Sequence, residues 1–314
     1  MERQPWVSFC ISTYKRPNIL HKQLQLLAQQ TFPDFEVIIS DNDPSASAKI
    51  VVESLNDSRF KYFPNNENIG MIRSFNKSIE RANTEFIVMV TDDDPIAPDF
   101  LQTFYYLYKQ FPKYSIYCGF KRSGKEEGFI EHISNDEFLI EVLDPRKTTN
   151  LLWSSSVMRR LDVIKTAMIP DYGSPHLADH AIITQVGSIN GGLIINKMYS
   201  SLTSHDENFS KLNFESYIKG CTGFYNYLQH SFKKHPKFRQ YERIIIKHLG
   251  TWFIANIFNL KKYYTIKKKN KAIIKNLNEL AQRIISLPFM ERYKFRYFFK
   301  TGIFYFKRIL GLLS

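Results

Sequence analysis

The chain has 314 residues, of which 44% are hydrophobic and 15% aromatic, a composition that excludes an intrinsically disordered protein and allows one large domain or a domain with an appendage. Three widely spaced cysteines without a CxxC pair argue against a disulfide framework and a thiolate metal site, and they fit a reducing cytosol. The net charge of +13 is unevenly distributed along the chain. Residues 211–314 hold 22 Lys and Arg against 4 Asp and Glu, whereas residues 1–210 hold 21 Lys and Arg against 26 Asp and Glu. The basic part is therefore expected to face an anionic partner.

Apolar runs and helical patterns alternate over the first hundred residues. We expect helices of this length between the strands to form βαβ units, and nearly continuous apolar strands to be covered by helices on both faces. The pattern therefore predicts an α/β domain with a mostly parallel sheet. The expected strands are 6–13, 35–41, 59–64 and 85–91, and the expected helices are 18–31, 45–56, 70–82 and 98–111.

The alternation becomes less regular after residue 114. A strand is expected at 114–120, a strand leading into a helix at 150–160, a short helix at 176–188 and a strand at 192–203. From about residue 211 onward the apolar spacing predicts helices only. We therefore divide the chain into an α/β domain over residues 1–210 and an all-helical region over residues 211–314.

Three aspartates, Asp92 to Asp94, directly follow the apolar strand expected at 85–91. In open α/β sheets, ligands bind beyond the carboxyl ends of the strands, where Asp41 and Thr13 are also expected. A divalent cation such as Mg²⁺ or Mn²⁺ would neutralise such a carboxylate cluster, since it commonly binds through one or two carboxylates plus substrate phosphates. The alternative is a solvated acidic turn that caps the next helix.

Four segments, VSFCISTYKRP, FEVIISDND, NIGMIRSFNKSIERA and FIVMVTDDD, resemble in this order and spacing the nucleotide-binding half of a family 2 glycosyltransferase. The later segments LADH (177–180) and HDENFS (205–210) also fit, whereas the last hundred residues are not part of the shared pattern. The resemblance implies a GT-A fold over residues 1–210, which is a Rossmann-type, mostly parallel sheet flanked by helices. It also implies a nucleotide-sugar donor and a role in bacterial surface polysaccharide biosynthesis.

The resemblance assigns roles in donor binding. Thr13 and Tyr14 would hold the base, with Tyr14 stacked on its face, and Asp41 would accept hydrogen bonds from the base, because an ionised carboxylate can only accept. Arg73 matches a basic residue near the base and the phosphates, although an exposed helical arginine is the alternative. Asp92 is expected near the ribose.

The same resemblance assigns the metal and the catalytic base. Asp94 would bind Mn²⁺ or Mg²⁺, Asp93 would assist Asp92 or Asp94, and His205 would bind the metal or the diphosphate. Asp179 occupies the position of the base of an inverting transfer. The family often has Glu-Asp there, whereas Ala178 precedes Asp179 in this chain, so His180 is a rival base and a helix-capping role for Asp179 is the alternative.

Basic residues in the last predicted helix recur at helical spacing, beside phenylalanine and aliphatic residues. This pattern predicts a helix that lies on an anionic membrane surface, or one that covers the core of the catalytic domain. The chain lacks a recognisable secretory signal and any apolar stretch of about 18 residues, so we expect a cytoplasmic protein, peripheral on the inner face of the plasma membrane. By analogy with the family, the acceptor is a glycan or a polyprenyl-diphosphate-linked sugar.

Three other functions are compatible with parts of the sequence. A basic, aromatic-rich region also occurs in nucleic-acid-binding proteins, but the chain has no zinc, RNP or helix-turn-helix signature, so no nucleic-acid partner is expected. A sugar nucleotidyltransferase usually has a glycine-rich loop after its first strand, whereas this chain has STYKRP there. A protein that binds sugars or nucleotides without catalysis remains a third alternative.

Overall fold

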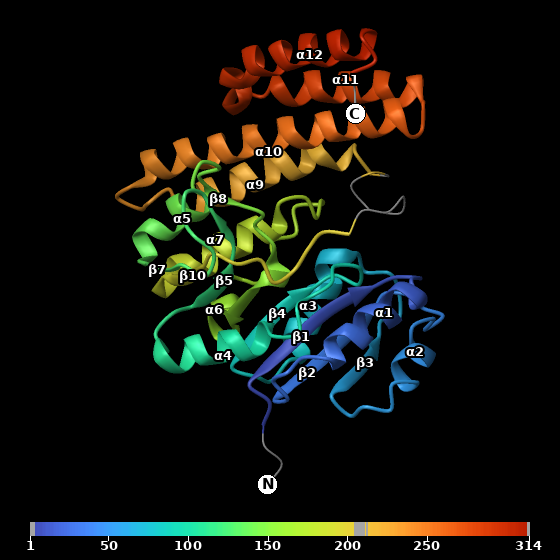
Figure 1. The fold of residues 1–314 in the computed structure, drawn as a ribbon, viewed down its shortest axis with the longest axis vertical. Helices are drawn as coiled ribbons and strands as arrows, with labels where there is room; N and C mark the ends of the chain where they lie inside the picture. The colour runs from blue at the N-terminus through green and yellow to red at the C-terminus, as the bar shows by residue number, and fades with distance from the viewer. Residues whose placement is uncertain (1–3, 204–210, 212, 313–314) are drawn as a thin grey trace. The chain divides into compact units, whose positions relative to one another are not determined.

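An eight-stranded mixed sheet forms the centre of the first part of the chain (Figure 1). The computed structural model describes residues 4–203, 211 and 213–312. The strand order is β3-β2-β1-β4-β9-β5-β10-β7, and β3, β2, β1 and β4 are mutually parallel. The strands are β1 (Val7–Thr13), β2 (Phe35–Asp41), β3 (Phe60–Pro64), β4 (Phe86–Val90), β5 (Ile116–Gly119), β7 (Ile130–Ile133), β9 (Ser156–Arg159) and β10 (Gly192–Ile195).

The predicted α/β class and mostly parallel sheet are confirmed, and the four strands expected in the first hundred residues form as predicted. Two later features differ from the expectation. The strand β9 pairs antiparallel with both β4 and β5, so it interrupts the parallel order. The strand expected over 192–203 ends at Ile195, and the side chain of the next residue, Asn196, donates to the carbonyl oxygens of Lys125 and Glu126.

Helices flank the sheet, and two short strands form a separate ribbon. The helices are α1 (Pro17–Ala28), α2 (Lys49–Glu53), α3 (Met71–Arg81), α4 (Phe100–Gln110), α5 (Asn135–Leu143), α6 (Arg160–Lys165) and α7 (Ala178–Asn190), with the 3-10 turn η1 (Trp153–Ser155). The ribbon pairs β6 (Lys121–Arg122) with β8 (Thr148–Thr149). The helix expected over 45–56 is only five residues long.

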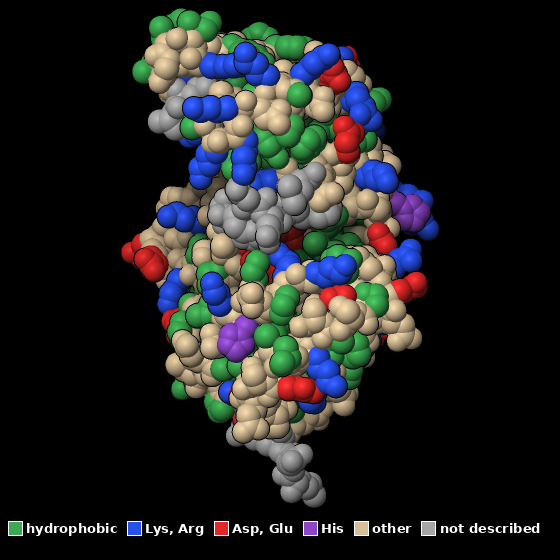
Figure 2. Space-filling view, turned by 90° about the vertical axis from the view of Figure 1, so that its right-hand side faces the viewer, with side chains coloured by type: hydrophobic (Ala, Val, Ile, Leu, Met, Phe, Trp, Pro, Cys, Tyr) green, Lys and Arg blue, Asp and Glu red, His purple; other side chains and the backbone are tan. Residues whose placement is uncertain are grey.

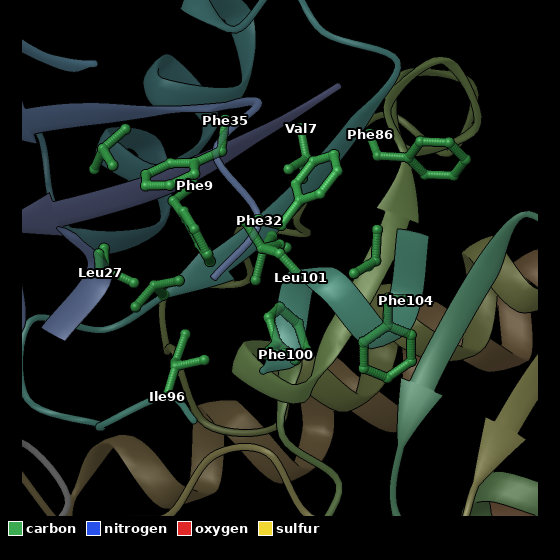
Figure 3. Close-up of a cluster of buried hydrophobic side chains, with 14 of the residues drawn as sticks. Val7, Phe9, Leu27, Phe32, Phe35, Phe86, Ile96, Phe100, Leu101 and Phe104 are labelled. Atoms are coloured by element: carbon green, nitrogen blue, oxygen red, sulfur yellow. The ribbon is translucent and has the colours of Figure 1, made fainter. Parts of the chain in front are cut away.

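Alternate residues of β1, β2 and β4 form one hydrophobic core (Figure 3). On this face of the sheet the rings of Phe9 and Phe35 meet edge to face, with centroids 5.6 Å apart, and Phe100 and Phe104 of α4 pack against the same cluster. Residues on the opposite face of the strands include Cys10 and Met89, which are also fully buried. Burial on both faces explains why these strands are nearly continuous apolar runs.

The chain separates into two compact units, and the second unit is helical. The first comprises residues 1–171 and 177–204, and the second comprises residues 172–176 and 205–314. The described helices of the second unit are α9 (Ser216–Phe232), α10 (Phe238–Ile266), α11 (Lys271–Ile285) and α12 (Lys294–Ile309), with the 3-10 helix η2 (Pro288–Tyr293) before α12. That residues 172–176 belong with the helices was not predicted. No helix in the described part of the chain is both long and apolar enough to cross a membrane.

Close packing in the helical unit depends on a glycine in α10. A Cβ atom at Gly250 would lie 2.4 Å from the ring of Tyr293, so the absence of a side chain lets η2 lie directly against α10. The next helix, α12, then packs through Tyr297 and Phe304, whose rings both contact Phe258 of α10.

Candidate active site

The carboxyl ends of β1, β2 and β4 meet at one edge of the sheet. Thr13 is paired with Asp41 in the parallel register of β1 and β2, and Ile11 is paired with Val90, the last residue of β4. The three aspartates follow Val90 directly, so they leave the sheet beside Thr13. The predicted positions of these residues relative to the sheet are therefore observed.

The carboxylate of Asp92 is held by two residues of the β1–α1 connection. The hydroxyl of Thr13 donates to Asp92 Oδ2 at 3.0 Å, and Arg16 Nη1 donates to Asp92 Oδ1 at 2.6 Å. Arg16 Nη2 also donates to Asp93 Oδ2 at 3.2 Å, so one guanidinium contacts two adjacent carboxylates and offsets part of their charge. Burial raises the pKa of Asp92 to about 6 even though Arg16 opposes the shift.

Arg16 was not predicted as a site residue. It precedes Pro17, the first residue of α1, and Lys15 before it adopts a left-handed φ of 55°. This turn brings the guanidinium to the aspartates, which lie 76 and 77 residues further along the chain. The available signal was a basic residue two positions after the expected base-binding Tyr14 and directly before Pro17.

Asp94 lies against the segment that leads to residues 204–210. The backbone N–H of Thr203 donates to Asp94 Oδ1 at 3.0 Å, and Gln23 of α1 donates to the Asp94 carbonyl oxygen at 2.8 Å. Backbone hydrogen bonds from Ala97 to Tyr199 (2.7 Å) and from Ser201 to Pro95 (3.3 Å) align the two segments. His205, the other predicted metal ligand, lies outside the described residues.

Asp41 is fully buried, and its carboxylate organises the loop that follows β2. Oδ1 accepts from the backbone N–H of Asp43 at 2.9 Å, and Oδ2 accepts from the backbone N–H of Ala48 at 3.2 Å and from the Tyr62 hydroxyl at 2.8 Å. Direct contact with a base would therefore require the loop after Asp41 to shift.

Tyr14 and Arg73 are the exposed members of the predicted donor site. Tyr14 is 40% exposed, and the Lys15 ammonium lies 5.3 Å from the centroid of its ring. Arg73 lies in the first turn of α3, which follows Gly70 at a left-handed φ of 88°. The carbonyl oxygen of Gly70 accepts from Asn42 at 3.1 Å, which ties the start of α3 to the end of β2. The Arg73 guanidinium itself donates to Asp171 at 3.1 Å.

Asp179 lies in the first turn of α7. This helix begins directly after Leu177, which adopts a left-handed φ of 65°. Its side chain is 27% exposed, yet burial raises the pKa of the carboxyl to about 7. His180 Nε2 lies 3.7 Å from Asp179 Oδ2, and burial lowers the pKa of His180 to about 4, so the imidazole is neutral near pH 7. The pair is therefore not a salt bridge at that pH.

Asp179 and Asp94 belong to one electrostatic cluster. The pKa of Asp94 is raised mainly by burial, and the negative charges of Asp93 and Asp179 raise it further. The two carboxyls, one after β4 and one in the first turn of α7, thus influence each other electrostatically. Such a pair can divide acid–base work from cation binding.

The described residues offer few ligands for a metal ion. Within the described ranges, no three His, Cys, Asp or Glu side chains form a group that could hold a metal ion on their own. Both carboxylate oxygen atoms of Asp92 already accept hydrogen bonds, from Thr13 and Arg16, so Asp94 is the better candidate for the hard ligand. A single carboxylate fits a Mg²⁺ or Mn²⁺ ion that takes its remaining ligands from substrate phosphates and water.

The chain is similar in sequence to known glycosyltransferases. The chain is 34% identical over 102 residues to the GalNAc(5)-diNAcBac-PP-undecaprenol beta-1,3-glucosyltransferase of Campylobacter jejuni, which is 32% of this chain and 33% of that protein. It is 28% identical over 106 residues to the putative colanic acid biosynthesis glycosyl transferase WcaA of Escherichia coli, which is 33% of this chain and 38% of that protein. The matched region thus spans about a third of the length of these curated relatives.

Solved structures share the fold over nearly the whole chain. S. aureus TarS 1–349 in complex with UDP-GlcNAc superposes with a TM-score of 0.64 at 15% identity, covering 95% of this chain and 92% of that one. The mannosyltransferase PcManGT of Pyrobaculum calidifontis, in complex with GDP-Man and Mn2+, gives 0.57 at 12% identity, covering 99% and 88%. The family model for glycosyl transferase family 2 matches residues 8–166, just over half of the chain. The chain therefore belongs to glycosyl transferase family 2.

Proposed function

We propose that this protein transfers a sugar from a nucleoside-diphosphate sugar to a hydroxyl of a glycan or of a polyprenyl-diphosphate-linked acceptor, with inversion at the anomeric carbon. The observation that carries the proposal is the cluster at the carboxyl edge of the sheet, where Thr13, Arg16 and Asp92 are joined by hydrogen bonds and Asp94 follows Asp92 closely in the chain. Membership of the family supports glycosyl transfer, and the donor, the stereochemistry and the acceptor are part of the proposal.

Donor binding is proposed for the residues around the ends of β1 and β2. Tyr14 stacks on the base with its exposed ring, Thr13 and Asp41 shape the base pocket, and Asp92 accepts from the ribose. Because the Asp41 carboxylate is buried, its role is either indirect, through the loop that it organises, or follows a shift of that loop. Arg73 is proposed to contact the phosphates, which would require it to leave the exposed pair with Asp171.

Asp94 is proposed to hold the divalent ion, with assistance from Asp93, and His205 is proposed as a further ligand. When bound, Mn²⁺ or Mg²⁺ offsets the negative charge that develops on the departing diphosphate. The protein's own contribution is the oxygen ligand of Asp94, which Thr203 orients by a hydrogen bond to Oδ1. TarS and PcManGT were solved with UDP-GlcNAc and with GDP-Man and Mn2+ respectively, which supports a nucleotide-sugar donor and a metal in this chain by analogy only.

The transfer step requires a base for the acceptor. The ionised carboxylate of Asp179 takes the proton of the acceptor hydroxyl as the new bond from that oxygen to the anomeric carbon forms. The bond from the anomeric carbon to the phosphate oxygen breaks, and the nucleoside diphosphate leaves with the electron pair. A pKa raised to about 7 suits this role, because the group can accept a proton and release it near neutral pH.

The acceptor and the location are proposed from a named relative and from the charge of the helical unit. The name of the Campylobacter jejuni relative contains a PP-undecaprenol substrate, which supports a polyprenyl-diphosphate-linked acceptor by analogy. We therefore propose that the protein works in the cytoplasm, peripheral on the inner face of the plasma membrane, in the biosynthesis of a surface polysaccharide. The basic helical unit is the candidate for contact with the anionic membrane.

The test is a panel of nucleoside-diphosphate sugars, incubated with Mn²⁺ or Mg²⁺ and a polyprenyl-diphosphate sugar acceptor. Release of nucleoside diphosphate together with a product of inverted anomeric configuration supports the proposal. Release of pyrophosphate from a sugar phosphate and a nucleoside triphosphate would instead identify a sugar nucleotidyltransferase. Binding of nucleotide without turnover on any donor would indicate a binding protein.

Metal-dependent binding is tested separately by isothermal titration. Asp94→Ala should abolish Mn²⁺-dependent binding of the nucleoside diphosphate while the far-UV spectrum and melting temperature stay near those of the wild type. Asp99→Ala is a matched control, because Asp99 is a half-exposed carboxylate paired with Lys197. Equal affinity of wild type and Asp94→Ala for nucleotide plus metal would reject the assignment of Asp94.

A further inference from the structure

Helix α12 exposes a continuous apolar face. The side chains of Phe295, Phe299 and Phe306 are 80%, 62% and 63% exposed. Further large apolar residues exposed on the same helix and just after it are Phe298, Ile303, Ile309, Leu310 and Leu312. In Figure 2, hydrophobic side chains gather along the top of the view, where Figure 1 draws α12. This many exposed apolar residues on one helix indicates an interaction surface.

This face is directed away from the helices that α12 packs on. Successive residues of an α-helix are about 100° apart, so Phe295, Phe299 and Phe306 lie within about 40° of one another. Tyr297 and Phe304, which are buried against α10, lie roughly on the opposite side of the helix. The exposed face is therefore separate from the surface that stabilises the helical unit.

A row of basic residues borders the apolar face. Arg296, Lys300 and Lys307 lie between it and the packing side of the helix, and all three are exposed. The one acid of residues 291–312 is Glu291, whose carboxylate pairs with Lys294. The row is thus cationic along its length, within a region that holds 22 Lys and Arg against 4 Asp and Glu.

We propose that this face of α12 docks on an anionic lipid bilayer. The helix would lie in the plane of the interface, with its phenylalanine and aliphatic side chains among the upper acyl chains and its basic row against the lipid phosphates. A bilayer matches both halves of the surface, because it supplies an apolar layer bordered by negative charge. A second copy of the chain matches less well, because an antiparallel pair of α12 helices would place the two cationic rows on the same side. A parallel pair would keep the rows apart but would supply no negative charge to either, since Glu291 is the one acid of residues 291–312.

The helix docks on the bilayer and does not cross it. It has 16 residues, which at about 1.5 Å each span less than the hydrocarbon core. The docking itself does not depend on the donor site, and only its purpose, to bring the enzyme to a lipid-linked acceptor, rests on the proposed function. Vesicle binding and nucleotide binding can therefore fail independently.

The experiment is co-sedimentation of the full chain with vesicles. Vesicles of phosphatidylcholine with about one third phosphatidylglycerol are compared with pure phosphatidylcholine vesicles at low and at physiological salt. We expect binding to the anionic vesicles that weakens with salt, because exposed charges are screened beyond about 8 Å at physiological ionic strength. The apolar triple variant Phe295→Ser, Phe299→Ser, Phe306→Ser should lower binding by on the order of tenfold or more.

Matched variants separate the two halves of the surface. The double variant Ile50→Ser, Leu161→Ser removes exposed apolar residues from the sheet unit and should leave vesicle binding unchanged. The charge variant Arg296→Gln, Lys300→Gln, Lys307→Gln should lower binding to anionic vesicles, whereas Lys22→Gln, Lys113→Gln, Lys121→Gln should not. All of these substitutions are at exposed positions, so melting temperatures and nucleotide binding should stay near those of the wild type.

Insertion of the α12 face into the bilayer is measured by tryptophan fluorescence. In Phe299→Trp, tryptophan emission should shift to the blue on anionic vesicles and be quenched by brominated acyl chains, whereas Ile50→Trp should show neither effect. Equal sedimentation with neutral and anionic vesicles at low salt would overturn the proposal. A dimer in solution that the apolar triple variant converts to a monomer would overturn it too, and would identify the face as a protein interface.

Discussion

Replacing Asp179 by Asn should lower turnover and raise stability. Asn keeps the size of the side chain but cannot take a proton, so turnover should fall by on the order of 10²–10⁴-fold while donor affinity is retained. In the wild type, kcat/KM should rise as the pH passes about 7, because burial raises the pKa of Asp179 to about 7 and the base must be ionised. The variant's residual activity should lack this rise.

The gain in stability follows from the same environment. Burial raises the pKa of Asp179 from 3.8 to about 7, which corresponds to at most about 4 kcal/mol. Because 27% of the side chain is exposed, we expect roughly half of this value. The folded-state pKa lies above the unfolded one, so the carboxyl favours folding while it is protonated, at low pH, and this contribution is lost as the pH rises through about 7. At pH 8 the wild type therefore carries a cost that Asp179→Asn does not.

The assay is urea unfolding of both proteins near pH 4 and pH 8, with turnover measured in parallel. The variant should be more stable by about 2 kcal/mol at pH 8 and close to the wild type near pH 4. Asp162→Asn is the matched control. Burial raises the pKa of Asp162, but hydrogen bonds from Lys165 and Ser115 outweigh it and hold this pKa below its usual value. The Asp162→Asn variant should therefore lose stability at pH 8.

Two results would refute the reasoning on Asp179. Unchanged turnover in Asp179→Asn, with lower stability at pH 8, would show that the residue only stabilises the start of α7, and would transfer the role of base to His180 or elsewhere. A product that keeps the anomeric configuration of the donor would reject the inverting mechanism altogether.

Three further predictions concern other described residues. Tyr14→Ala should weaken nucleotide binding by about tenfold in isothermal titration, because base stacking on an aromatic ring is lost, whereas Tyr14→Phe should bind nearly as well as the wild type. Arg16→Met should lower the free energy of unfolding by about 1–3 kcal/mol, because Asp92 and Asp93 lose their shared cation. Arg16→Lys should lose less stability than Arg16→Met. Unaltered stability in Arg16→Met would contradict the pairing. Lys261→Met should stabilise the protein at pH 7, because burial lowers the pKa of this fully buried amine to about 8. The folded-state pKa of Lys261 lies below the unfolded one, so wild-type stability rises between about pH 8 and 10. The advantage of Lys261→Met in thermal unfolding should therefore shrink over this range. A constant advantage would contradict a lowered pKa for Lys261.

The sequence by itself determined the α/β class, the first four strands and the edge where the aspartates lie. Strands buried on both faces must be nearly continuous apolar runs, and the helices between them have their own period, so both signals are local. Once β1, β2 and β4 are parallel, their carboxyl ends share one edge, and Thr13, Asp41 and Asp92 must lie there. The division of the chain at residue 210 into a catalytic domain and a membrane-associating region, and the roles of the site residues, stay predictions.

Only the tertiary structure decided which of these side chains meet. The antiparallel insertion of β9 involves four residues, too few for a periodic signal, and its position depends on pairing with β4 and β5. The contact of Arg16 with Asp92 and that of Thr203 with Asp94 join residues 76 and 109 apart in sequence. The burial that raises the pKa of Asp179 likewise comes from packing around α7. Burial and long-range hydrogen bonds depend on residues distant in the chain, and no local pattern of apolar and polar residues specifies them.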